Sequence, residues 1–135
     1  MALEYIDFNI QYLDQLIELW NETLTHDLIN EYIFLQRIAY DPNFDATMSR
    51  LAVDQGKVVG YCHGVKRKES YYTKGLEPER GWINFIFVDI NYRRKGIATR
   101  LYKHVEEKLF LQGATSITLC AYSPNYLNPG IDIRF

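Results

Sequence analysis

Apolar positions near the amino end of the chain follow the spacing of helices. Five of them, at the spacing i, i+3, i+4, i+7 and i+11, would share one face of a first helix: Leu13, Leu16, Ile17, Trp20 and Leu24. A broader apolar stripe predicts a second helix over residues 29–39, which Asp41-Pro42 ends because proline disfavours helical backbone in the residue before it. An alternating run at residues 4–8 predicts an edge strand ahead of both helices.

A β-hairpin is predicted next. Two apolar runs, residues 51–53 and 58–62, flank Asp54-Gln55-Gly56-Lys57, in which Gly56 supplies the positive φ that a tight turn needs. The following stretch, residues 66–80, is polar, carries both charge signs and has no period, so we expect a solvated loop. Its basic triplet Lys66-Arg67-Lys68 is interpreted as a solvated strand end with glutamates close by.

The second half of the chain has the pattern of a strand, a helix and a strand. Residues 82–88 are almost continuously apolar, which predicts the central strand of a sheet, covered on both faces. A helix begins near Gly96 and ends at Gly113, and residues 116–121 predict a parallel strand reached by a right-handed crossover. The predicted fold class is therefore α/β, with a mixed sheet of about five strands and flanking helices.

Composition and charge narrow the class of protein. At 135 residues the chain is long enough for one buried core, so we expect a single domain over residues 1–135. The net charge of −2 gives no general attraction to nucleic acid or anionic membranes, and no apolar run reaches the roughly 18 residues of a membrane span. Cys62 and Cys120 lie in apolar runs and are expected to be buried free thiols. We expect a cytoplasmic protein that binds neither nucleic acid nor membranes.

The start of the second-half helix carries an unexpected charge. Arg93, Arg94 and Lys95 precede it, although a helix amino terminus is already partly positive and each such mismatch costs about 0.3–1 kcal/mol. No acidic residue follows in the first turn, so an external anion is the simplest compensation. Gly96 and the small Ala98 leave room for a ligand against the backbone. The sequence therefore predicts a phosphate site here.

The same residues resemble a family signature. Arg93-x-x-Gly96-x-Ala98 after an apolar strand is similar to the (Gln/Arg)-x-x-Gly-x-(Gly/Ala) motif of the GNAT acetyltransferases, and two helices and a hairpin precede it in that family's order. The resemblance implies an N-acetyltransferase that uses acetyl-CoA as cosubstrate, requires no metal, and acetylates a primary amine of a small molecule or peptide. The alternative is a GNAT-like domain that binds acyl-CoA without turnover, as a regulatory or interaction module of a larger protein.

A third interpretation is an unrelated nucleotide-phosphate binder. It is weaker because the chain contains neither Gly-x-x-x-x-Gly-Lys-Ser/Thr nor Gly-x-Gly-x-x-Gly. The family resemblance also implies how the coenzyme is held: the backbone of the strand end pairs with its pantetheine arm, and main-chain N–H groups of the loop and helix start hold its pyrophosphate. The implied coenzyme-binding set is Phe87, Val88, Arg93, Arg94, Lys95, Gly96, Ile97, Ala98 and Thr99.

The catalytic base and acid are left unassigned. Many family members place a glutamate on or beside the central strand, where this chain offers only Asn84 as a polar side chain. Asp89 is the nearest carboxylate, and its position at the strand end favours a loop-ordering role. Tyr122 and Tyr126 are weak candidates for the acid. Nothing in the sequence places two of the three histidines together, and His63 is expected to be packed or solvated rather than to face a substrate groove.

The carboxyl end departs from the family pattern. The family usually continues with a helix and two more strands, whereas residues 123–132 have the pattern of a loop, with two prolines and a glycine. The chain resembles the amino-terminal portion of a longer, tandem GNAT protein. We therefore expect the missing strands to come from a second GNAT domain or from another copy in a homodimer, because an exposed strand edge invites pairing.

Overall fold

Five strands form one mixed sheet in the order β1-β2-β3-β4-β5. The computed structural model describes residues 3–68 and 76–119. The strands are β1 (Leu3–Asp7), β2 (Ser49–Asp54), β3 (Lys57–Val65), β4 (Arg80–Val88) and β5 (Ser116–Leu119). Neighbours pair antiparallel except β5, which is parallel to β4. The predicted mixed sheet is confirmed, and the strand expected at residues 4–8 is β1, which ends one residue earlier, at Asp7.

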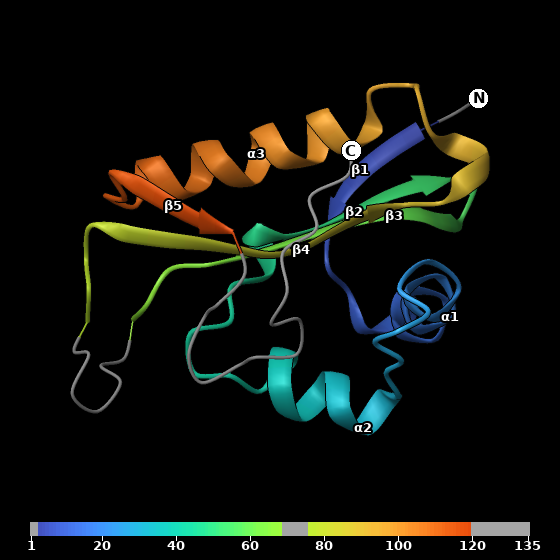
Figure 1. Ribbon diagram of the computed structural model, residues 1–135, viewed down its shortest axis with the longest axis horizontal. Coiled ribbons are helices and arrows are strands. Elements are labelled where there is room, and N and C mark those ends of the chain that lie inside the picture. Colours follow the sequence, from blue (N-terminus) through green and yellow to red (C-terminus); the bar gives the residue numbers. More distant parts are fainter. Residues whose placement is uncertain (1–2, 69–75, 120–135) are drawn as a thin grey trace.

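Helices cover both faces of this sheet, as Figure 1 shows. On one face lie α1 (Leu13–Thr23) and α2 (Glu31–Phe34), which continues into a π-helical segment, Leu35–Ala39. On the other face lies α3 (Ile97–Leu111). All three predicted helices are confirmed. The wider π turn accounts for the irregular apolar stripe of the second one, because it shifts the positions that face the sheet.

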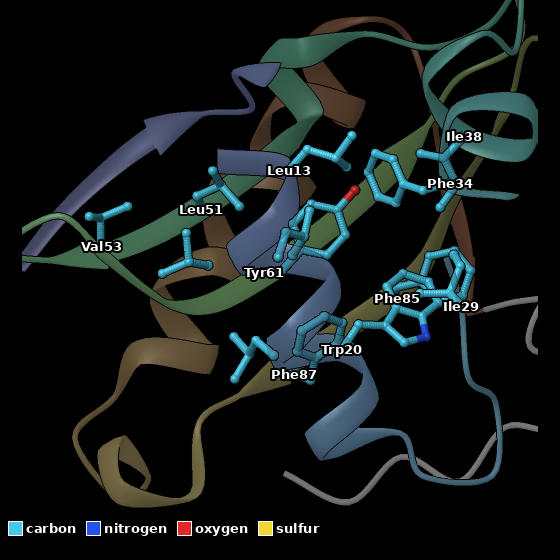
Figure 2. Close-up of a cluster of buried hydrophobic side chains, with 13 residues drawn as sticks. Leu13, Trp20, Ile29, Phe34, Ile38, Leu51, Val53, Tyr61, Phe85 and Phe87 are labelled. Carbon is cyan, nitrogen blue, oxygen red and sulfur yellow. The ribbon is translucent and has the colours of Figure 1, made fainter. Parts of the chain in front are cut away.

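Aromatic and aliphatic side chains together fill the core between α1, α2 and the sheet (Figure 2). The ring of Trp20 on α1 lies 4.5 Å from that of Phe85 and 5.6 Å from that of Phe87, both on β4. Phe34 of α2 packs edge-on against Trp20 at 6.5 Å. Such pairs contribute about 0.5–1.5 kcal/mol each beyond the area they bury. They fix the carboxyl half of α1 beside the carboxyl half of β4.

The core under α3 is aliphatic and close-packed. Four residues at steps of four are buried, as the sequence predicts: Ile97, Leu101, Val105 and Leu109. Opposite them, Gly64 on β3 has no room for a side chain, because an added Cβ would collide with Val105. The close approach of α3 to the sheet fixes where its amino end lies relative to the end of β4.

The β2–β3 hairpin has the predicted turn. Gln55 and Gly56 have φ of 48° and 83°, the pair of positive values that a two-residue hairpin turn of type I′ uses. The prediction that residues 82–88 form the middle strand is wrong in one respect. β3 is the middle of the five strands, and β4 lies beside it. An apolar run indicates that both faces of a strand are covered, which is true of β4. It does not indicate the position of the strand within the sheet.

The basic triplet corrects another expectation. Lys66 and Arg67 are buried, with 6% and 3% of their surface exposed, and only Lys68 is exposed. The guanidinium of Arg67 lies 4.8 Å from the ring centroid of Trp82, and its Nε lies 3.4 Å from a carboxylate oxygen of Glu77. An aromatic face and a nearby carboxylate allow the charged group to be buried. The predicted proximity of a glutamate is thus confirmed, and the predicted solvation is wrong.

Several expectations fall outside the described residues. Among these are the middle of the predicted loop (residues 69–75), the end of the last predicted strand, Cys120, Tyr122 and Tyr126, and the expected truncation of the fold. Cys62 is described and is a buried free thiol, as expected. In the described part of the chain, the helices are too short or too polar to cross a membrane.

Candidate functional site

A hollow of about 680 Å³ lies where the carboxyl end of β4 meets the amino end of α3. Its described lining comes from the end of α1, the end of β4, the β4–α3 turn and the first turn of α3. The lining residues are Thr23, Leu24, Ile86, Phe87, Val88, Tyr92, Arg93, Arg94, Gly96, Ile97, Ala98 and Thr99. Every member of the coenzyme-binding set predicted from the sequence is present except Lys95, which is exposed beside the hollow.

The amino end of α3 has no side-chain cap. The N–H groups of the first turn of an α-helix have no acceptor within the helix. In α2 the side chain of Asn30 accepts one of them, from Ile33, at 2.8 Å. In α3 the cap position is Gly96, which has no side chain, and the first turn contains no acidic residue. These N–H groups and the helix dipole together favour an anion, and the residues that carry them line the hollow.

Gly96 gives this helix start its shape. Its backbone is left-handed, with φ 78° and ψ 10°, a conformation that a residue with a Cβ rarely adopts. A Cβ built at Gly96 would meet no atom within 4 Å, so packing within the protein does not require a glycine here. The absence of a side chain instead leaves the main chain open toward the hollow. An open, uncapped helix start of this kind favours an anion such as a phosphate group.

The turn before Gly96 is strained. Arg94 has a φ of 64°, also in the left-handed region, which costs an ordinary residue about 1–2 kcal/mol. The side chain of Arg93 turns back toward the strand, where its Nε donates to the carbonyl oxygen of Val88 at 3.2 Å. Arg93, Arg94 and Lys95 are all exposed. Their attraction for an anion is therefore screened by water. The directional contacts to an anion would come from the main-chain N–H groups.

Asp89 orders the beginning of the turn. It is 7% exposed, and its Oδ1 accepts the N–H of Asn91 at 2.8 Å, which caps the short 3₁₀ helix Ile90–Tyr92. Its own N–H donates to the carbonyl oxygen of Val59 on β3 at 2.8 Å. Its Oδ2 lies 3.8 Å from the ammonium group of Lys57. These contacts confirm the expected loop-ordering role.

Tyr92 is a lining residue that the sequence reasoning did not select. Its hydroxyl donates to Oδ2 of Asp54 at 2.7 Å. That hydrogen bond to a carboxylate, with the negative charge beside it, raises the pKa of the Tyr92 phenol above its usual value. Its place directly before the basic run was a signal that the sequence contained. Thr23 and Leu24 gave no such signal, because they reach the hollow only through the packing of α1 on β4.

Groups that could move protons are scarce around the hollow. Of the described residues that line it, none is an aspartate or a glutamate. Asn84 is buried at a bulge in β4, where the pairing with β3 skips one residue. No group of three histidine, cysteine, aspartate or glutamate side chains in residues 3–68 and 76–119 could hold a metal ion.

His63 lies away from the hollow, in the aromatic core. It is 2% exposed and stacks on Phe44, Tyr61 and Phe85, with ring centroids 5.9, 6.2 and 6.2 Å away. Burial lowers the pKa of its imidazole to about 3, so the ring is neutral at physiological pH. The packed role expected for it is confirmed.

Comparison with known proteins gives one family. The sequence matches the acetyltransferase (GNAT) family model over residues 11–127. None of the curated proteins matches it significantly. Many solved structures are similar in fold, and three of them are described next.

The first of these is Ard1 from Thermoplasma volcanium, with TM-score 0.68 and 18% identity over 88% of this chain and 71% of that one. The second is Naa50 from Arabidopsis thaliana with the bisubstrate analogue CoA-Ac-MVNAL, with TM-score 0.64 and 22% identity over 88% and 72%. The third is an aminoglycoside acetyltransferase from an uncultured soil metagenomic sample with sisomicin, with TM-score 0.62 and 21% identity over 90% and 78%. At these identities the likeness shows the fold alone.

Proposed function

The chain belongs to the acetyltransferase (GNAT) family, and from this premise we propose that it transfers an acetyl group from acetyl-CoA to a primary amine. The observation that carries the proposal is the start of α3, which presents main-chain donors without a side-chain cap to the hollow beside β4. A helix start of this kind suits the pyrophosphate of a coenzyme. The space beside the strand end suits the arm that bears the acyl group.

Each part of the predicted set has a role in this proposal. The main-chain N–H groups from Arg93 or Arg94 through Thr99 would hold the pyrophosphate, and the exposed cations would add a screened attraction. The backbone of Phe87 and Val88 would pair with the pantetheine arm. The thioester supplies an acyl carbon that a neutral amine can attack. The residues present fit the coenzyme because Gly96 leaves the main chain open and no carboxylate lines the described part of the hollow.

The acceptor amine must lose a proton, and the departing thiolate must gain one. Because no described lining residue is a carboxylate, we propose that the amine loses its proton to water rather than to a side chain of the described lining. One structurally similar protein is named an aminoglycoside acetyltransferase, and another, Naa50, is in complex with the bisubstrate analogue CoA-Ac-MVNAL. We propose the same broad class here, a primary amine of a small molecule or a peptide, in a single domain located in the cytoplasm.

A second candidate function is supported by the same absence of carboxylates from the described lining. A domain that binds acyl-CoA without turnover needs the donors of α3 and does not need a base. It would act as a regulatory or interaction module. The two functions share one binding site and differ only in whether the bound thioester reacts.

Calorimetric titration of the purified chain with acetyl-CoA, CoA and ATP tests the shared premise. We expect acetyl-CoA and CoA to bind and ATP to bind more weakly, because ATP lacks the arm that pairs with β4. A preference for ATP would overturn the proposal. If acetyl-CoA binds, release of free thiol in the presence of a panel of amines separates the catalyst from the binding module.

A further inference from the structure

The turn from β4 into α3 is tied to the tip of the β2–β3 hairpin. The hydroxyl of Tyr92 bonds to Oδ2 of Asp54 at 2.7 Å, between residues 38 positions apart. The ammonium group of Lys57 lies 3.8 Å from Oδ2 of Asp89 and 5.8 Å from the ring centroid of Tyr92. Asp54 and Lys57 are register partners at the two ends of the hairpin turn. The hairpin therefore contacts the turn through a hydrogen bond, an ion pair and a ring face.

The contact lies next to a strained segment. Tyr92 is followed by Arg93 in extended conformation and by Arg94 with a φ of 64°, and Gly96 then begins α3. A non-glycine residue stays in the left-handed region only where its surroundings hold it there. The side chain of Arg93 bonds back to Val88 on β4, and the hydrogen bond from Tyr92 to Asp54 ties the same turn to the β2–β3 hairpin.

Tyr92 also lines the hollow, so its position affects the site directly. A shift of its ring would move the backbone of the turn that follows it. The first N–H groups of α3 would then be displaced from a bound phosphate, and hydrogen bonds weaken steeply when distance or angle departs from the optimum. The raised pKa of the Tyr92 phenol keeps the hydroxyl protonated and able to donate.

We propose that Asp54 and Tyr92 are positioning residues for the anion site, and that their hydrogen bond holds the turn in the geometry that directs the amino end of α3 at the pyrophosphate of the coenzyme. This inference rests on the proposed function, because it is tested through the affinity of the chain for the coenzyme. Neither residue needs to touch the reacting atoms. Their effect passes through the backbone of the turn.

Calorimetric titration with CoA on the whole chain tests the inference. We expect Tyr92→Phe and Asp54→Ala each to raise the Kd for CoA about three- to tenfold, the worth of one hydrogen bond. The double variant should bind no more weakly than the weaker single variant, because both changes remove the same bond. Asp54→Asn keeps an acceptor oxygen and should restore most of the affinity.

Asp7→Ala is the matched control. It removes a carboxylate that bonds to Arg50 at 2.6 Å between β1 and β2, away from the turn. We expect a loss of thermal stability comparable with that of Asp54→Ala and an unchanged Kd. A merely structural role for Asp54 and Tyr92 would give their variants the same result as this control, and would overturn the inference.

The failures of the two proposals are distinguishable. If the wild-type chain binds CoA, and Tyr92→Phe and Asp54→Ala bind it equally well, the inference is wrong and the proposed function stands. If their effects on Kd add fully in the double variant, the inference is also wrong, because they then act separately. If the folded wild-type chain does not bind CoA, the proposed function and the inference fail together.

Discussion

At the scale of single residues, Gly96 carries the strongest prediction about the site. We expect Gly96→Leu to raise the Kd for CoA more than tenfold, because the new side chain would enter the space over the main-chain donors. The strain of a left-handed leucine also lowers stability, by about 1–2 kcal/mol. Calorimetry with CoA and thermal unfolding measure the two effects separately.

Gly113 provides the control for that change. Its φ is 99°, an added Cβ would also meet open space, and it follows the opposite end of α3. Gly113→Leu should therefore cost a similar amount of stability and leave the Kd for CoA unchanged. Equal changes of Kd in the two variants would mean that the site lies elsewhere.

His63 makes the stability of the fold depend on pH. Its imidazole binds a proton only near pH 3 in the folded chain, against about 6.5 in the unfolded chain. The unfolded state therefore binds more protons between these values, and this contribution to stability is full above pH 6.5 and is lost as the pH falls. At pH 5 the expected loss is about 2 kcal/mol relative to pH 7.

Urea unfolding at pH 7 and pH 5 measures this loss. His63→Phe keeps an aromatic ring among Phe44, Tyr61 and Phe85 and cannot take up a proton, so its stability should fall less on acidification. His26→Gln, at an exposed position, should behave as the wild type. An equal pH dependence in wild type and His63→Phe would show that His63 does not cause the loss.

At the scale of the element, helix stability and anion binding favour opposite charges at the amino end of α3. A negative side chain there would stabilise the helix by about 0.3–1 kcal/mol, yet the first turn has none and three cations precede it. Thr99→Glu should therefore raise the thermal stability and also raise the Kd for CoA, about tenfold, by repelling the phosphates. On one preparation, thermal unfolding tests the expected rise in stability, and calorimetry tests the expected rise in the Kd for CoA.

The other end of α3 supplies the comparison. Leu111 is 76% exposed, and Leu111→Glu adds the same charge where the helix dipole disfavours it. We expect lower thermal stability with an unchanged Kd for CoA. If Thr99→Glu instead bound CoA as tightly as the wild type, the amino end of α3 would not be the anion site.

At the scale of the whole molecule, the structural features that could be predicted are those that depend on residues close together in the sequence. The three helices, the hairpin turn at Gly56 and the parallel pair of β4 and β5 follow from periods and turn residues. The coenzyme-binding set followed from the resemblance to the family motif, which could be recognised because its residues are nearly contiguous, and the structure gathers all but Lys95 around the hollow. Its role in binding stays a prediction.

Contacts between distant segments could not be predicted. Arg67 is buried because the ring of Trp82 lies against its guanidinium, whereas its own stretch of sequence, which includes Glu77, reads as solvated. Tyr92 bonds to Asp54 only because the hairpin folds back beside the turn. Both depend on which surfaces meet in the folded chain, and a pattern of charged and apolar letters does not contain that information.

The lining of the hollow combines the end of α1 with the start of α3, and these two helices lie on opposite faces of the sheet. The site therefore exists only when both layers are packed, and a ligand there is bound by the folded chain alone. A ligand present at a hundred times its Kd would stabilise that chain by about 2.7 kcal/mol. Because proteases in cells degrade mainly chains that have opened, we expect the lifetime of this protein in the cell to lengthen when its ligand is abundant.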